Sequence, residues 1–280
     1  MGDWANLFAF MFALWPWFSP DTLEIHRNEV FKVVDGQGRR LDVVLPANAD
    51  APTPIVLIVH GGMWIAGDKI HYPFLKRFLV SKGIACAALD YGLEIDNGFY
   101  GRVVDIKDAL RWLRLHAEEL NIDPNRVGMF GSSAGGHLAA LTGFSGDNEG
   151  FGSDPPGQSS EVEALFLLYG VYDLENIPAD PLVEAIVASD IERGLAEDIS
   201  VFSPLNHIDG SEPPTHIIHG TADRVAPFWQ AEATAAALEA EGVPVTLEVE
   251  EDMPHAFART MPTTRPWIYQ AVADFFEDQL

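Results

Sequence analysis

The short stretch 131–135 contains the residue types that nucleophilic catalysis requires. It reads Gly-Ser-Ser-Ala-Gly, so that a glycine stands two residues before and two residues after Ser133. The apolar run 126–130 before it follows an Asp-Pro-Asn turn and predicts a buried strand, whereas the small residues 136–141 after it favour a helix. On a tight strand-to-helix turn, side chains at the two glycine positions would collide. The pattern therefore predicts an exposed serine hydroxyl at a helix N-terminus, where unpaired N–H groups favour negative charge.

A serine hydroxyl is a poor nucleophile at neutral pH unless other groups assist it. It requires a base within hydrogen-bond reach, a carboxylate that orients the base, and donors for the oxyanion that develops. Asp223 follows the predicted strand 216–220, and His255 follows the predicted strand 245–249. The order nucleophile, carboxylate, histidine is the one expected when the serine lies on such an elbow. The sequence therefore offers both partners that the serine needs.

Candidate oxyanion donors follow an earlier strand. His60-Gly61-Gly62 comes directly after the apolar run 54–59. A backbone without side chains brings its N–H groups close to a ligand, so Gly61 and Gly62 are candidate donors. Ala134, the residue after the serine, offers a further N–H group.

Other residues compete for these roles. His137 lies four residues after Ser133 and is a weaker candidate for a direct catalytic role, and His60 is expected to anchor the oxyanion loop. Asp173 is a rival for the orienting carboxylate, although it precedes the helix-rich segment 176–212. Bulky side chains near predicted strand ends are candidates for a substrate pocket, with simple packing as the alternative for each: Met63, Trp64, Tyr172 and Phe257.

The elements that must position these residues alternate along the chain. Helical patterns at 73–82, 102–120, 231–241 and 266–280 separate apolar runs that predict strands. About eight strands are expected, of which the first two form a hairpin: 30–34, 41–45, 54–59, 84–90, 126–130, 164–170, 216–220 and 245–249. The alternation predicts an α/β fold with a mostly parallel, doubly wound sheet flanked by helices.

Four motifs in this order resemble the α/β-hydrolase superfamily of carboxylesterases. They are 60–62, 131–135, Asp223 and His255, and the resemblance runs from about residue 25 to the C-terminus. The chain is most similar to the branch of hormone-sensitive lipase and of bacterial acetyl and feruloyl esterases. This resemblance implies an α/β-hydrolase fold with a small or N-terminal cap.

The resemblance also implies a role for each candidate residue. Ser133 is expected to be the nucleophile, His255 the general acid and base, and Asp223 the carboxylate that orients it. The N–H groups of Gly61, Gly62 and Ala134 would form the oxyanion hole. The implied reaction is hydrolysis of small acyl or aryl esters through an acyl-enzyme, with no cofactor and no metal.

The sequence departs from this family at two positions. Met63 stands where many members have a third glycine, and the stretch 60–64 also resembles kynurenine formamidases, which share the fold and the triad. An amidase of that kind is therefore the second hypothesis, and a non-catalytic binding protein with a hydrolase fold is a remote third. Gly92 follows Asp90-Tyr91 where an arginine is usual, which puts the usual salt bridge behind the site in doubt.

The charge of the chain excludes some partners. The 17 basic and 42 acidic residues give a formal net charge of −25, which argues against nucleic acid and against anionic lipid surfaces. The only cysteine, Cys86, excludes an internal disulfide and lies in an apolar run, where a free thiol acts as a small buried hydrophobe. No spacing of Cys and His residues indicates a metal site.

Residues 1–25 form a separate apolar and aromatic segment before a single catalytic domain at 26–280. The segment lacks the positive start and the small-residue cleavage site of a signal peptide, so we expect a cytoplasmic protein. Its apolar run is short and broken for a membrane span. We expect it to cover the mouth of the active site or to form a homodimer contact, with an acyl-chain interface as the alternative.

Overall fold

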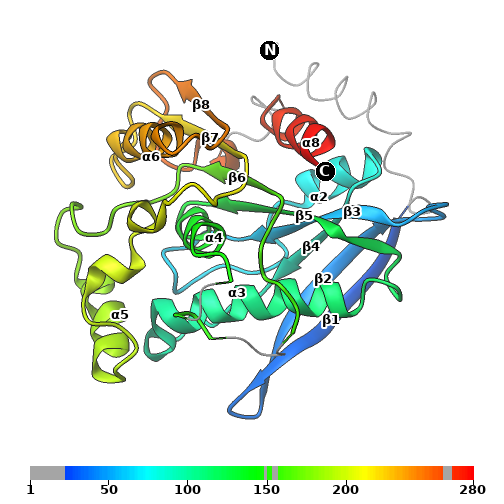
Figure 1. Cartoon of the computed structure of the whole chain (residues 1–280), viewed down its shortest axis with the longest axis horizontal. Helices are drawn as coiled ribbons and strands as arrows, with labels where there is room; N and C mark the ends of the chain where they lie inside the picture. The colour runs from blue at the N-terminus through cyan, green and yellow to red at the C-terminus, as the bar shows by residue number, and fades with distance from the viewer. Residues whose placement is uncertain (1–22, 148–149, 153–156, 261–266) are drawn as a thin grey trace, which may run out of the picture.

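The computed structural model describes residues 23–147, 150–152, 157–260 and 267–280, which form one sheet with helices on both faces (Figure 1). The order of the eight strands across the sheet is β1-β2-β4-β3-β5-β6-β7-β8. Their bounds are β1 Leu23–Val34, β2 Gln37–Pro46, β3 Thr53–Val59, β4 Ala85–Leu89, β5 Ile122–Ser132, β6 Ala164–Leu168, β7 Thr215–Gly220 and β8 Val245–Glu250. β2 pairs antiparallel with β1 and with β4, and the remaining pairs are parallel. The predicted, mostly parallel sheet is confirmed.

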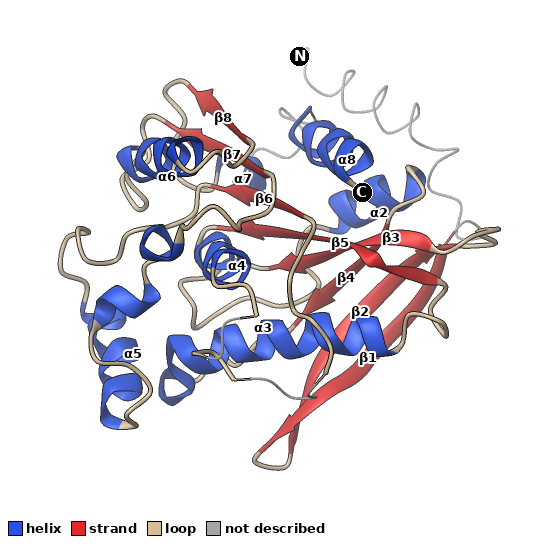
Figure 2. Cartoon of the chain, viewed as in Figure 1, coloured by secondary structure: helices blue, strands red, loops and turns tan. Residues whose placement is uncertain are grey.

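Helices cover the sheet from both sides, which confirms the doubly wound arrangement (Figure 2). α2 and α8 pack with one buried cluster on one face, whereas α3, α4, α5 and α6 contribute to a second cluster on the other. The bounds are α2 Pro73–Ser81, α3 Gly98–Leu115, α4 Ala134–Phe144, α5 Pro181–Glu192, α6 Trp229–Ala240, α7 Phe257–Thr260 and α8 Trp267–Gln279, with 3₁₀ turns η3 Ile95–Asn97, η4 Ile199–Phe202 and η5 Pro204–His207. No helix among the described residues is long and apolar enough to cross a membrane.

The central strands are apolar along their whole length because helices bury both of their faces. Every residue of β4 and β6 is buried, and so is every residue of β3 except Pro54. Burying each large aliphatic side chain there contributes about 1.5–3 kcal/mol relative to leaving it exposed. Cys86 is fully buried in β4, as predicted, and burial raises the pKa of its thiol to about 12.

Several predicted boundaries differ from the structure by a few residues, and tertiary contacts explain two of them. α3 begins at Gly98 rather than at residue 102, because the carboxylate of Asp190 on α5 accepts the N–H groups of Phe99 and Tyr100 at 2.6 and 3.2 Å. A cap supplied by a distant helix leaves no local signal. β1 begins at Leu23, which pairs with Pro46, so the sheet takes in residues that the prediction assigned to the N-terminal segment. The rest of that segment, residues 1–22, lies outside the described residues.

Candidate active site

The stretch 131–135 forms the predicted elbow between β5 and α4. Ser133 has φ 54° and ψ −125°, a left-handed conformation that is strained for a residue with a side chain. A Cβ on Gly131 would lie 2.3 Å from the carbonyl oxygen of Gly135, and a Cβ on Gly135 would lie 2.3 Å from that of Val59. Both positions therefore require glycine. The N–H of Ser133 donates to Leu168 O at 2.9 Å, which ties the turn to β6.

A chain of hydrogen bonds joins the three residues that the sequence predicts as nucleophile, base and carboxylate. Ser133 Oγ lies 2.7 Å from His255 Nε2, and His255 Nδ1 lies 2.6 Å from Asp223 Oδ2. Because the carboxylate accepts the Nδ1 proton, His255 Nε2 is left as the acceptor for the serine hydroxyl. Asp223 follows β7 and His255 follows β8, at the edge of the sheet where β5 ends in the elbow.

The carboxylate of Asp223 is fully buried, but hydrogen bonds surround it. Its Oδ1 accepts the N–H groups of Val225 and Ala226 at 2.9 Å each, and Oδ2 lies 3.4 Å from His219 Nε2. Burial raises the pKa of this carboxyl, but the hydrogen bonds with His219 and His255 outweigh burial and hold the pKa well below its usual range. Asp223 is therefore ionised at neutral pH.

Tyr169 packs against His255, and the sequence analysis did not single it out. It follows the last residue of β6 with φ 38°, and its ring meets that of His255 edge to face with the centroids 5.2 Å apart. On its other side it meets Phe257 at 5.3 Å. It lies inside the predicted strand 164–170, which ends at Leu168 in the structure, so no signal in the sequence indicated its turn toward His255. Tyr169 restricts the directions in which the His255 ring can turn.

Gly61, the first glycine after β3, lies against the elbow. A Cβ on Gly61 would lie 2.7 Å from Ser132 O and 3.1 Å from Ser133 Cβ, so a side chain there would collide with the nucleophile's own turn. Within the described part of the chain, the N–H groups of Gly61 and Gly62 have no hydrogen-bond acceptor. The N–H of Ala134 opens helix α4 and has no acceptor within the helix. These three N–H groups therefore remain candidates for the oxyanion donors.

The loop that carries these glycines is strained and anchored. Met63 and Trp64 have φ values of 54° and 62°. The Trp64 indole is buried and donates to His137 Nδ1 at 3.0 Å, while Arg102 Nε donates to Trp64 O at 3.2 Å. At the start of the loop, the ring of His60 stacks on Tyr91 with the centroids 4.4 Å apart. The loop is therefore held at several points.

The rival residues face elsewhere. Burial lowers the pKa of His137 to about 4, and this ring lies between Trp64 and the carbonyl oxygen of Phe202 rather than beside the serine. His60 Nδ1 lies 3.0 Å from Gly61 O, in line with an anchoring role. Asp173 accepts the N–H groups of Glu175 and Asn176 in its own turn, at 3.0 and 3.1 Å.

The four predicted pocket residues differ in exposure. Met63 is 40% exposed on the loop that follows β3, whereas Trp64, Tyr172 and Phe257 are buried. The Tyr172 hydroxyl accepts the N–H of Gly170 at 3.2 Å, and Phe257 packs in the cluster on the α2 and α8 side of the sheet. These three rings belong to the packed core. Nearness to a strand end in the sequence does not tell on which face a side chain lies.

A salt bridge between Arg39 and Asp105 lies directly beside Gly92. Arg39 on β2 places Nε 3.3 Å from Asp105 Oδ2, and the same carboxylate oxygen accepts the N–H of Gly92 at 2.9 Å. A Cβ on Gly92 would lie 2.5 Å from Arg39 Nη2. The guanidinium of Arg39 therefore occupies the space beside residue 92.

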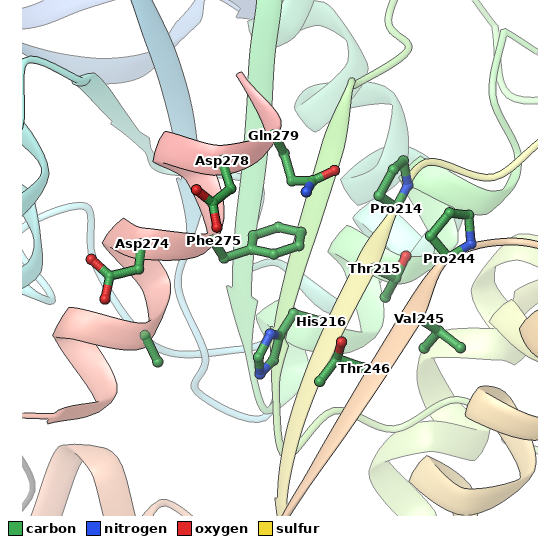
Figure 3. A pocket seen from close by; sticks show the side chains of 11 residues that line it. Pro214, Thr215, His216, Pro244, Val245, Thr246, Asp274, Phe275, Asp278 and Gln279 are labelled. Carbon is green, nitrogen blue, oxygen red and sulfur yellow. The ribbon is translucent and has the colours of Figure 1, made fainter.

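A pocket of about 500 Å³ lies at the other end of β7 and β8, between the starts of these strands and α8 (Figure 3). The rings of His216 and Phe275 line it, and Asp274 and Asp278 lie on its helical side. None of the candidate catalytic residues lines it. Among the described residues, no group of three or more His, Cys, Asp or Glu side chains is arranged to hold a metal ion.

A family model, curated relatives and solved structures are all similar to this chain. A family model described as BD-FAE matches residues 41–238. Esterase LipC of Mycobacterium tuberculosis is 30% identical over 198 residues, which cover 68% of this chain and 49% of LipC. The chain spans about half the length of the curated relatives it matches.

Two solved structures of an esterase from Thermogutta terrifontis are similar over almost the whole chain. Esterase 2 phosphoramylated by tabun has a TM-score of 0.78 at 26% identity, covering 93% of this chain and 96% of that one. The propionate-bound form of Est2 has a TM-score of 0.75 at 29% identity, covering 94% and 95%.

Proposed function

The chain belongs to the BD-FAE family and has the α/β-hydrolase fold, and from this premise we propose that it is a serine carboxylesterase for small acyl or aryl esters. One observation carries the proposal, namely the continuous hydrogen-bond chain from Ser133 through His255 to Asp223. The named esterases among its relatives support the same reaction class.

In the proposed reaction, the substrate is first bonded to the enzyme. His255 Nε2 takes the proton of Ser133 as Oγ attacks the ester carbonyl carbon. The carbonyl oxygen becomes an oxyanion, which the N–H groups of Gly61, Gly62 and Ala134 stabilise. The bond to the alcohol oxygen then breaks, and His255 returns its proton to the departing alcohol.

The second half releases the acid. A water molecule attacks the acyl carbon and gives its proton to His255, and a second oxyanion forms. Its collapse breaks the bond to Ser133 Oγ, which takes the proton back from His255. Throughout, the ionised Asp223 holds His255 in the required tautomer and stabilises the imidazolium.

Small acyl groups are the proposed substrate class. The similar esterase from Thermogutta terrifontis is known with propionate bound, a three-carbon acid. The test is hydrolysis of p-nitrophenyl esters from acetate to dodecanoate, with the Ser133→Ala variant as control. We expect the highest kcat/KM at acetate or butyrate and no activity above background in the variant. Hydrolysis that survives in Ser133→Ala would refute the assignment of the nucleophile.

A covalent probe tests the nucleophile separately from turnover. Because the similar esterase is phosphoramylated by tabun, we expect diethyl p-nitrophenyl phosphate to modify Ser133. Mass spectrometry of the peptide that contains residues 131–135 would locate the adduct. Ser132→Ala is the matched control, since it removes the neighbouring hydroxyl and should leave labelling in place. A label on Ser132 or on another serine would contradict the proposal.

A kynurenine-formamidase-like amidase is the second candidate, motivated by the sequence 60–64. In the structure, the Trp64 side chain is buried and donates its indole N–H to His137 Nδ1 at 3.0 Å. Parallel assays with N-formyl-kynurenine and p-nitrophenyl acetate distinguish the two. Faster hydrolysis of the formyl anilide would move the assignment to the amidase. Absence of hydrolysis with both substrates would leave the non-catalytic binding protein.

A further inference from the structure

We propose that His137 is a positioning residue for the oxyanion hole, acting through its hydrogen bond with Trp64. The inference rests on the proposed function, because it assumes that the N–H groups of Gly61 and Gly62 bind the oxyanion. It concerns a fully buried histidine that the triad does not use.

The oxyanion loop needs an anchor because its backbone is unfavourable on its own. Gly62, Met63 and Trp64 have φ values of 139°, 54° and 62°. Residues with a Cβ rarely adopt such values, and consecutive ones are rarer. Strained segments persist only where their surroundings fix them. Of these three residues, Trp64 is the one whose side chain can anchor the loop, since Met63 is 40% exposed and Gly62 has no side chain.

The anchor is a directed polar contact inside an aromatic cage. Trp64 is 3% exposed, and its Nε1–H donates to His137 Nδ1 at 3.0 Å. The two rings are nearly perpendicular, and the ring of Phe99 meets both of them, with centroids at 5.3 and 5.1 Å. A buried indole N–H without an acceptor is costly, so this bond selects one orientation of Trp64.

His137 is itself fixed at both ring nitrogens. Its Nε2–H donates to Phe202 O at 2.8 Å, which leaves Nδ1 as the acceptor that the indole requires. The low pKa that burial gives this histidine agrees with a neutral ring. One tautomer therefore serves both contacts.

The position of His137 on α4 explains why this bond matters for catalysis. Its backbone N–H donates to Ser133 O at 3.0 Å, so it lies one helical turn after the nucleophile. The same helix begins with Ala134, a proposed oxyanion donor. The Trp64–His137 bond thus connects the loop that carries two donors to the helix that carries the third donor and the nucleophile. Donors displaced by a fraction of an ångström stabilise the transition state less.

A second contact keeps the loop folded when this bond is removed. Arg102 Nε donates to Trp64 O at 3.2 Å, independently of the indole. Loss of the Trp64–His137 bond should therefore loosen the loop rather than unfold it. We expect an effect smaller than that of deleting an oxyanion donor, which costs about 10²–10³-fold in kcat.

The experiment compares Trp64→Phe, which keeps an aromatic ring without the N–H, with His137→Leu, which removes the acceptor. Each should lower kcat for p-nitrophenyl acetate by about 10- to 100-fold and leave KM within about twofold. The double variant should be no slower than the slower single variant, because both changes break one bond. His137→Asn, whose amide oxygen can accept the indole N–H, should recover most of kcat.

The matched control is Phe202→Leu. It disturbs the same packing but retains the backbone oxygen that accepts the His137 proton. A trifluoromethyl ketone forms an adduct with a serine that places an oxyanion in the hole. The affinity for this inhibitor should fall in parallel with kcat in Trp64→Phe and should remain near that of the unmodified protein in Phe202→Leu.

Equal kcat in Trp64→Phe and Phe202→Leu would overturn the inference, and so would a change in KM with unchanged kcat. If His137→Leu does not fold, Trp64→Phe and His137→Asn decide the question. Failure of the proposed function itself is distinguishable, because it would appear as activity that survives in Ser133→Ala or as no esterase activity in the unmodified protein.

Discussion

Replacing Asp223 by asparagine is the sharpest test of the proposed triad, because it removes a charge without changing the shape of the side chain. The neighbours of Asp223 dictate how the new amide is oriented. Oδ1 of the carboxylate accepts the N–H groups of Val225 and Ala226 at 2.9 Å each. An amide oxygen satisfies both donors, whereas an amide NH₂ at this place would leave both without an acceptor, and the buried N–H of Ala226 alone would then cost about 1–3 kcal/mol.

The amide NH₂ must therefore face His255, whose Nδ1 lies 2.6 Å from the present Oδ2. A donor at this place forces Nδ1 to accept, so the histidine proton moves to Nε2. His255 then presents N–H to the Ser133 hydroxyl and cannot take its proton. The equivalent change in a Ser-His-Asp protease lowers kcat about 10⁴-fold, or about 5.5 kcal/mol of transition-state stabilisation.

Initial rates with p-nitrophenyl acetate at neutral pH measure this effect, with Ser133→Ala as the background. KM should change little, because Asp223 is buried behind His255 and does not touch the substrate in the proposed reaction. Asp173→Asn is the matched control, since the same exchange at the rival carboxylate should leave kcat within about twofold of the unmodified protein. A loss of less than about tenfold in Asp223→Asn would refute the assignment of the orienting carboxylate.

Three further changes test other parts of the structure. Gly61→Ala places a Cβ 2.7 Å from Ser132 O. We expect kcat to fall by about 10²–10³-fold while the circular dichroism spectrum is retained. An unchanged kcat would show that the loop does not supply a donor. Tyr72→Phe removes the buried hydrogen bond between the Tyr72 hydroxyl and Ser132 Oγ, which is 2.5 Å long. We expect the free energy of unfolding, measured in urea, to fall by about 1–2 kcal/mol. An unchanged value would mean that this bond contributes no net stability. Burial, and then the charge of the nearby Arg111, lowers the pKa of Lys107 to about 8. Because the unfolded chain holds this proton more tightly than the folded protein does, the free energy of unfolding should rise with pH between about 8 and 10.4. Urea unfolding across this range should show the rise in the unmodified protein and a smaller one in Lys107→Met, and equal slopes would contradict it.

The sequence predicted the framework of the site because its signals are local. The elbow 131–135 needs glycines at fixed spacing, and apolar runs bounded by turns predicted the strands that carry Asp223 and His255. The order of the motifs along the chain was enough to pair them. The structure places the three predicted residues within hydrogen-bond distance of one another.

Features that depend on tertiary contacts were not predictable in this way. The start of α3 is set by Asp190 from another helix, and the position of Tyr169 beside His255 depends on a turn after β6. Trp64 and Tyr172 were candidates for a substrate pocket, with simple packing as the alternative, and the sequence did not show that both side chains are buried. A strand end specifies where a residue lies along the sheet and leaves its direction to the neighbours.

The close packing of Arg39 against residue 92 has a consequence for how related chains can vary. A side chain at residue 92 and a guanidinium from residue 39 compete for one volume beside Asp105. The two positions should therefore covary among relatives, with an arginine at one and a small residue at the other. A chain that changes from one arrangement to the other must pass through a form in which both side chains crowd that volume, or one in which Lys32 is the cation left beside Asp105, so we expect the second substitution to compensate for the first.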